Sequence, residues 1–203
     1  LFLHCRTTPG YGQMWHLNGF YTRTNHEALS FSMFANGIAP AVVTGGNWEF
    51  LTEVWHRIAA CESHMAGAEL IPYAALHFGE DTLAWYANAR GDDTRRAYLM
   101  SVFGLFQALL ETHLPVTIIT DDDLEDPARL ARHACVILPN SACLSDRQVG
   151  ALAAYVDAGG GLVAAFETGV FDENGTRREQ PALGELTGVN QESVKGGVSW
   201  LLR

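Results

Sequence analysis

The sequence predicts an α/β fold in which a parallel sheet is covered by helices on both faces. Two observations lead to this prediction. From Pro72 onward, short apolar runs alternate with longer segments of helical periodicity. Each short run is continuously apolar, which is typical of a strand buried on both faces. Because right-handed crossovers place the connecting helices on the faces of a sheet, this order of elements indicates a parallel sheet of the flavodoxin-like type.

The elements of this domain follow one another at short intervals. After the first strand, each helix leads into the next strand, and Asn174-Gly175 signals a tight turn after the last one. The expected strands are 73–78, 116–120, 135–138 and 162–166, and the expected helices are 94–113, 127–132, 145–158 and 181–186.

The helix over 94–113 carries an apolar stripe that should face the sheet. Its polar residues, such as Arg95 and Glu111, fall elsewhere on the helix. The expected stripe consists of Leu99, Val102, Phe103, Phe106, Leu109 and Leu110.

The helix over 145–158 has signals at both ends. Ser145 and Gln148 stand at the spacing of a capping box, and Gly159 can adopt the left-handed conformation that ends a helix. The two signals fix the bounds of this element.

Residues 1–71 lack the regular alternation of apolar runs and helical segments and are expected to form a separate part. A loop and a helix precede a buried strand at 38–44, and Asn47 can cap a helix over 48–66. The domain boundary is expected at residues 71 and 72. The α/β domain then extends over 72–190, and residues 191–203 start a following segment.

Composition excludes several classes of protein. A net charge of −10 over 203 residues opposes nucleic-acid binding, which draws its affinity from Lys and Arg. No apolar run reaches the length of about 18 residues that a membrane span needs. The start at Leu1 lacks the features of a signal peptide. We expect a soluble protein, with its location open and the cytoplasm slightly favoured.

Metal and nucleotide sites are also not expected. The four cysteines form no C-x-x-C pair and no zinc-ligand spacing, so that buried free thiols are the simplest interpretation. Asp123 is expected to cap a turn in preference to binding a cation. The glycines at 159–161 precede a strand, whereas a phosphate loop follows one.

Ligands of parallel sheets bind beyond the carboxyl ends of the strands, so the residues there are the first candidates for a site. Cys143 lies among them, just before a helix, where a thiolate would be stabilised as in class I glutamine amidotransferases. However, it lacks flanking glycines, and all eight histidines precede it. The remaining candidates at this edge are Glu80, Asp81, Asp121–Asp123, Asn140, Ser141, Glu167 and Thr168.

The first part of the chain contains residue types that line sugar sites, where aromatic rings stack on the sugar and polar groups bind its hydroxyls. Glu49 could be a nucleophile, but a helix-capping role in the first turn is favoured. No pair of carboxyl groups at the separation of about 5 to 9.5 Å that glycosidases need is evident. The candidate residues are Arg6, His16, Asn18, His26, Trp48 and Glu49.

Several motifs resemble the β-galactosidase trimerisation domain, in the right order over about residues 72–189. They include His113-Leu-Pro-Val116, Thr120-Asp-Asp-Asp-Leu124, Val136-Ile-Leu-Pro-Asn140, Tyr155-Val-Asp-Ala-Gly-Gly-Gly-Leu-Val163 and Ala182-Leu-Gly-Glu-Leu-Thr-Gly188. Upstream, Arg6-Thr-Thr-Pro-Gly10, Trp15-His16 and Ala35-Asn-Gly37 resemble the end of the (β/α)8 barrel in family 42 glycoside hydrolases.

The resemblance implies a retaining β-galactosidase-like parent that binds a carbohydrate, uses no organic cofactor and forms a homo-oligomer, specifically a trimer. The acid/base Glu of the family would precede Leu1, so this chain alone should be inactive. The family nucleophile lies on a longer loop than Thr44–Asn47 provides, which leaves the nucleophile unassigned. Two alternatives stay open: a non-catalytic carbohydrate-binding or scaffold protein of the same family, and an amidotransferase-like enzyme that uses Cys143.

Overall fold

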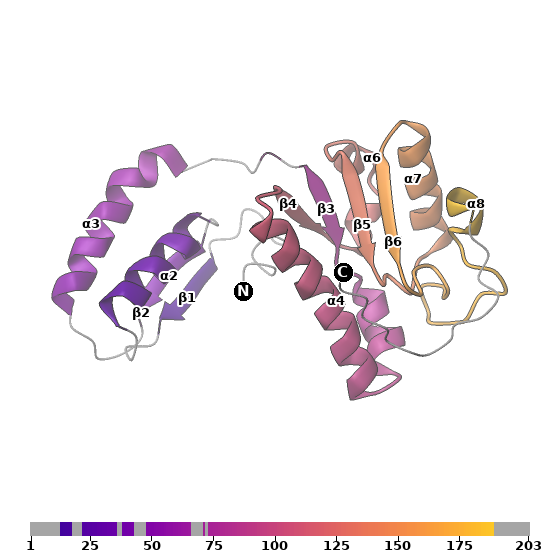
Figure 1. Ribbon diagram of the computed structural model, residues 1–203, viewed down its shortest axis with the longest axis horizontal. Helices are drawn as coiled ribbons and strands as arrows, with labels where there is room; N and C mark the ends of the chain where they lie inside the picture. Colours follow the sequence, from indigo (N-terminus) through magenta and orange to yellow (C-terminus); the bar gives the residue numbers. More distant parts are fainter. Residues whose placement is uncertain are drawn as a thin grey trace, which may run out of the picture. The chain divides into compact units, whose positions relative to one another are not determined.

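The computed structural model describes residues 13–17, 22–35, 38–42, 48–65, 71 and 73–188. In 13–17, 38–42 and 48–50 it describes the backbone only. The chain divides into two compact units, Leu1–Ile71 and Pro72–Arg203. Figure 1 shows the elements of both units, which are described separately below.

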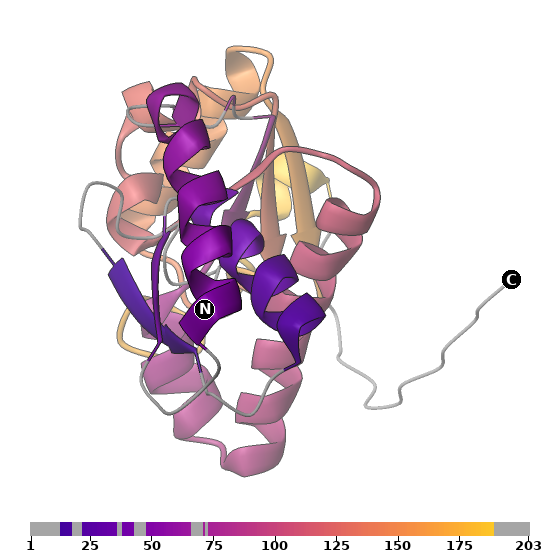
Figure 2. The same ribbon diagram turned by 90° about the vertical axis from the view of Figure 1, so that its left-hand side faces the viewer.

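The first unit contains two parallel strands and two helices. β1 (Gln13–Leu17) pairs with β2 (Ile38–Val42), and α2 (Arg23–Ala35) connects them. α3 (Trp48–Met65) follows within a residue of its predicted bounds. It lies beside α2 (Figure 2), and the Arg23–Glu53 and Arg57–Glu27 ion pairs join the two helices. Leu51, Val54 and Ile58 are the buried positions of α3.

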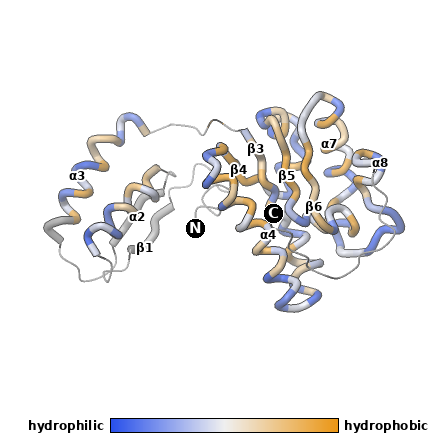
Figure 3. Tube along the Cα trace, in the orientation of Figure 1, coloured by the Kyte–Doolittle hydropathy of each residue, from blue (hydrophilic) through white to orange (hydrophobic). Residues whose placement is uncertain are grey.

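The second unit contains a sheet of four parallel strands, which confirms the predicted fold class. The strands lie in the order β4-β3-β5-β6, so that the first strand of the unit sits between the second and the third. This is the order of a flavodoxin-like sheet. The strands are β3 (Ala74–His77), β4 (Val116–Ile119), β5 (Cys135–Pro139) and β6 (Gly161–Ala165). Figure 3 shows that apolar residues dominate them.

Helices cover both faces of β3, β4 and β5 (Figure 1). α4 (Asp92–Glu111) packs against β3, β4 and β5. On the other face, α5 (Asp121–Leu124), α6 (Pro127–Leu130) and α7 (Asp146–Asp157) enclose a core that includes Val136, Leu138 and Leu152. The alternation of side chains along each strand sends neighbouring residues to these two separate cores. The edge strand β6 departs from the predicted burial on both faces, because α4 does not reach it and Val163 is 50% exposed.

The apolar stripe of α4 is rotated from its predicted position. Val102 and Phe106 are buried as expected, but Phe103 and Leu110 are exposed, and Tyr98, which lies outside the predicted stripe, is fully buried. The Tyr98 hydroxyl donates to the carbonyl of Gly79 (3.0 Å) and accepts from its N–H (2.9 Å). Because both hydrogen-bonding roles are satisfied, the phenol can occupy the core without an unpaired polar group.

The ends of α7 are as predicted. The Ser145 hydroxyl accepts from the N–H of Gln148 (3.1 Å), and the Gln148 side chain accepts from the N–H of Ser145 (2.8 Å). Gly159 follows the helix with a φ of 97°, a conformation that favours glycine. The sequence therefore specifies this helix locally, before any tertiary contact is considered.

Two short elements at the carboxyl end of the sheet were not predicted. The π-helix η1 (Thr82–Asn88) follows β3, and α5 follows β4. The short helix expected at 181–186 is present as α8 (Gly184–Thr187), which begins three residues later. Among the described residues, no helix is long and apolar enough to cross a membrane.

Candidate functional site

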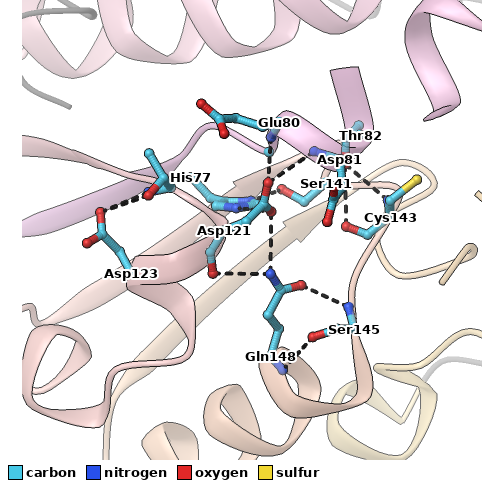
Figure 4. Close-up of polar contacts among 12 residues, drawn as sticks. His77, Glu80, Asp81, Thr82, Asp121, Asp123, Ser141, Cys143, Ser145 and Gln148 are labelled. Atoms are coloured by element: carbon cyan, nitrogen blue, oxygen red, sulfur yellow. Dashed lines mark hydrogen bonds and ion pairs between the residues drawn. The ribbon is translucent and has the colours of Figure 1, made fainter. Parts of the chain in front are cut away.

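Three polar side chains meet beyond the carboxyl ends of the strands (Figure 4). His77 is the last residue of β3, and its Nδ1 lies 2.7 Å from the hydroxyl of Ser141, which follows β5. Its Nε2 lies 3.1 Å from Oδ1 of Asp121, which follows β4. This point, where the strand order reverses between β3 and β5, is the position at which parallel sheets bind ligands.

Asp121 is the centre of this network. Its Oδ2 accepts from the backbone N–H groups of Glu80 (2.6 Å) and Asp81 (3.1 Å), and Gln148 of α7 donates to its carbonyl (3.1 Å). Burial by itself raises the pKa of Asp121, but the hydrogen bond and charge of His77 and the two N–H groups outweigh it and lower the pKa. The carboxylate therefore joins β3, β4 and α7 in its ionised form.

The order Ser141, His77, Asp121 is that of a nucleophile, base and orienting acid. However, His77 and Ser141 are both 0% exposed. A nucleophile must reach its substrate, and neither side chain can do so in this structure. The hydrogen-bonding groups of the three side chains bind one another and the neighbouring backbone. The arrangement therefore holds the strand ends together.

Cys143 has the properties of a structural thiol. It is 0% exposed, and its N–H donates to the hydroxyl of Thr82 (3.1 Å). Burial raises the pKa of the Cys143 thiol to about 12, and the carboxylates of Asp81, Asp172 and Asp121 add to the effect. An activated cysteine needs a lowered pKa and an accessible sulfur. The environment of Cys143 therefore opposes the amidotransferase-like hypothesis.

The other cysteines depart from the predicted burial. Cys61 is exposed and Cys135 is half-buried, so Cys143 is the one buried thiol among the described residues, and Cys5 lies outside them. The prediction of buried thiols is wrong for Cys61 because it lies on the solvent side of α3.

The triple aspartate has the predicted structural role. Asp123 accepts from the N–H of Thr120 (3.0 Å) and pairs with Arg129 (3.0 Å). It thereby completes a capping box at the start of α5. In the described part of the chain, no group of three or more His, Cys, Asp or Glu side chains is arranged to hold a metal ion.

A second polar cluster lies at the β6 side of the same edge. The Tyr86 hydroxyl of η1 donates to Glu167 (2.6 Å), which follows β6. Arg90 pairs with the same Glu167 oxygen (3.6 Å), and its guanidinium lies 4.5 Å from the ring centres of both Tyr86 and Phe171. Burial, together with the hydrogen bond to Glu167, raises the pKa of Tyr86 to about 12, so the phenol remains a donor.

The predicted sugar-site residues are placed only in part. Arg6 and Asn18 lie outside the described residues. His16 belongs to β1, and Trp48 and Glu49 begin α3, but their side chains lie outside the described ones. His26 is buried on α2, so it does not line a surface.

Sequence reasoning missed several residues of this edge, including His77, Tyr86 and Arg90, and it gave Gln148 only its capping role. A histidine at the carboxyl end of a buried strand was the available signal for His77. No local signal pointed to Tyr86 and Arg90, because η1 does not follow the usual helical period.

The family described as the β-galactosidase trimerisation domain matches residues 73–196, which is more than half of the chain. The chain belongs to this family. The matched range covers the entire four-stranded sheet and both polar clusters of its carboxyl edge.

Solved structures share this fold at low sequence identity. The β-galactosidase from Bacillus circulans sp. alkalophilus is 14% identical, with a TM-score of 0.74 over 93% of this chain and 33% of that one. Gan42B, a GH42 β-galactosidase from G. stearothermophilus, is 16% identical, with a TM-score of 0.68 over 88% of this chain and 31% of that one. No curated protein sequence matches the chain.

The β-galactosidase from Bifidobacterium adolescentis is 21% identical, with a TM-score of 0.50 over 62% of this chain and 57% of that one. The chain therefore spans between about a third and just over half of the length of these three proteins. At these identities the likeness concerns the fold. Together with the family match, it makes the chain a piece related to glycoside hydrolases.

Proposed function

We propose that the α/β unit assembles a β-galactosidase-like glycoside hydrolase into a homotrimer and performs no chemistry itself. One observation supports this most directly: the candidate groups for catalysis at the carboxyl edge are buried and engaged with one another. His77 and Ser141 are inaccessible, and the pKa of Cys143 is raised. The family description supports the role in assembly.

The carbohydrate chemistry belongs, in this proposal, to the parent protein. Residues 1–71 form the end of a (β/α)8 barrel, in which Arg6, His16, Asn18 and Trp48 contact the carbohydrate. Glu49 remains a weak candidate for the nucleophile of a retaining reaction, and the acid/base group lies outside this chain. No organic cofactor is needed for this reaction, because a pair of carboxyl groups is sufficient.

Sedimentation of the 203-residue chain tests the role in assembly. We expect the mass of a trimer of the 22.2 kDa chain. The same preparation should neither hydrolyse a nitrophenyl galactoside nor release ammonia from glutamine. A monomer at all accessible concentrations would contradict the role in assembly, and a glutaminase activity that iodoacetamide abolishes would replace it with the Cys143 mechanism.

A further inference from the structure

The loop after β6 contains a tight turn at Asn174 and Gly175. Phe171 and Arg177 form an antiparallel bridge at the base of this loop. The Asn-Gly pair predicted a turn here, and the structure has one. The Asn174 side chain is exposed, whereas Gly175 is partly buried. The turn therefore combines an accessible side-chain amide with a backbone nitrogen that is packed against the protein.

Asp172 binds three successive N–H groups of this turn. Its Oδ1 accepts from the N–H of Asn174 (3.0 Å) and from that of Thr176 (2.8 Å). Its backbone carbonyl accepts from the N–H of Gly175 (3.0 Å), and its own N–H donates to the carbonyl of Thr176 (2.9 Å). Hydrogen bonds from backbone N–H groups to a carboxylate are strong. Asp172 therefore fixes the backbone of the turn.

Position 175 requires a glycine. Its φ of 77° lies in the left-handed region, where a side chain is strained. A Cβ at this position would also lie 2.8 Å from the Cβ of Trp85 and 3.3 Å from the carbonyl oxygen of Trp85. The backbone conformation and the contact with η1 both demand that a glycine follow Asn174.

An asparagine that precedes a glycine is chemically labile, because the glycine places no side chain in the path of the reaction. The backbone nitrogen of Gly175 can attack Cγ of Asn174. A C–N bond then forms between these atoms, and the side-chain nitrogen leaves as ammonia with the proton of the attacking N–H. The product is a cyclic succinimide, and water opens this ring to leave aspartate or isoaspartate at position 174.

We propose that Asn174 is a deamidation site and that the native turn suppresses its reaction, because Asp172 binds the attacking nitrogen. This nitrogen must lose its proton and approach Cγ of Asn174. Both changes require the hydrogen bond from Gly175 to Asp172 to break. The reaction therefore depends on a local opening of the turn. The inference is independent of the proposed role in assembly.

The products should weaken the contact of this turn with η1. Aspartate at position 174 adds a negative charge beside Asp172 and Glu173, where like charges repel one another. Isoaspartate also leads the backbone through the former side-chain carbon. The turn then cannot keep its hydrogen bonds to Asp172 and the close approach of Gly175 to Trp85 together.

Peptide mapping by mass spectrometry measures the deamidation of Asn174 in the full chain at neutral pH. The Asn18-Gly19 and Asn36-Gly37 pairs are references for the rate in an unfolded chain. In concentrated urea, we expect all three asparagines to react at similar rates. Without urea, Asn174 should react at least about tenfold more slowly than in urea. Equal rates of Asn174 in the two conditions would overturn the inference, as would an Asn174 that stays intact in urea while the references react.

Three variants test the role of Asp172. Asp172→Ala should raise the native rate at Asn174 roughly 5- to 30-fold, since the loss of two hydrogen bonds to a carboxylate makes the turn easier to open. Asp172→Asn keeps the side-chain oxygen as an acceptor and should restore most of the suppression. Glu173→Ala, at the exposed neighbouring position, is the matched control and should leave the rate unchanged. An unchanged rate in Asp172→Ala, with an unchanged circular dichroism spectrum, would overturn the role of Asp172.

Discussion

At the scale of single residues, the buried contact of Asp121 with His77 is the feature with the clearest energetic consequence. The pKa of Asp121 is lowered in the folded protein, whereas in the unfolded chain it is about 3.9. A carboxylate of this kind stabilises the fold above its unfolded pKa, and this stability is lost as the pH falls through the folded pKa. The contribution of Asp121 is therefore complete at neutral pH.

Asp121→Asn should lower the free energy of unfolding at pH 7 by about 1 to 3 kcal/mol, because it removes a buried charge that three donors satisfy. The difference from the wild type should shrink as the pH falls below about 4, where Asp121 of the unfolded wild-type chain begins to protonate while the folded form still holds its charge. Urea denaturation across this pH range measures both effects. Glu179→Gln, at an exposed position, is the control. A difference that stays constant with pH would contradict the role assigned to the charge.

At the scale of elements, the sequence predicted those whose signals are local. α7 begins and ends at residues with their own capping chemistry, and the strands are short apolar runs bounded by polar ones. The exact face of α4 could not be predicted, since the choice between Tyr98 and Phe103 depends on the partner that Gly79 offers. Features that depend on one segment alone could thus be predicted, and the error at α4 arose from a contact between two segments.

The polar network of the carboxyl edge could not be predicted from the sequence for the same reason. That His77 ends one strand and Asp121 follows the adjacent one could have been inferred from their order along the chain. The contact of His77 with Ser141 requires β5 to lie on the other side of β3. Strand order is a property of the whole sheet, and no local pattern in 135–141 contains it.

Ser145→Ala tests the strongest local signal. The hydroxyl of Ser145 satisfies the N–H of Gln148, which has no partner within the helix. Its loss should reduce the free energy of unfolding by about 1 kcal/mol. Thermal denaturation measures this change. Ser145→Thr keeps the acceptor and should recover most of the loss, whereas equal losses in both variants would show that capping is not the cause.

At the scale of the whole molecule, the two units differ in what they can bury. The unit from Pro72 has a four-stranded sheet with a core on each face. The described part of the first unit has two parallel strands and two helices, and its buried apolar side chains, Met33, Leu51, Val54 and Ile58, are far fewer than those of the second unit. Because the stability of a unit grows with the apolar surface that it buries, the first unit should be the less stable of the two.

We therefore expect residues 72–203 to fold and to associate without residues 1–71. Their urea transition should be cooperative and close to the wild-type one, since the cores of the sheet lie within this range. Residues 1–71 alone should give the poorly dispersed amide spectrum of an unfolded chain. If instead residues 72–203 failed to fold, the sheet would need the first unit as part of its core. If they folded but stayed monomeric while the full chain formed trimers, the first unit would contribute to the interface.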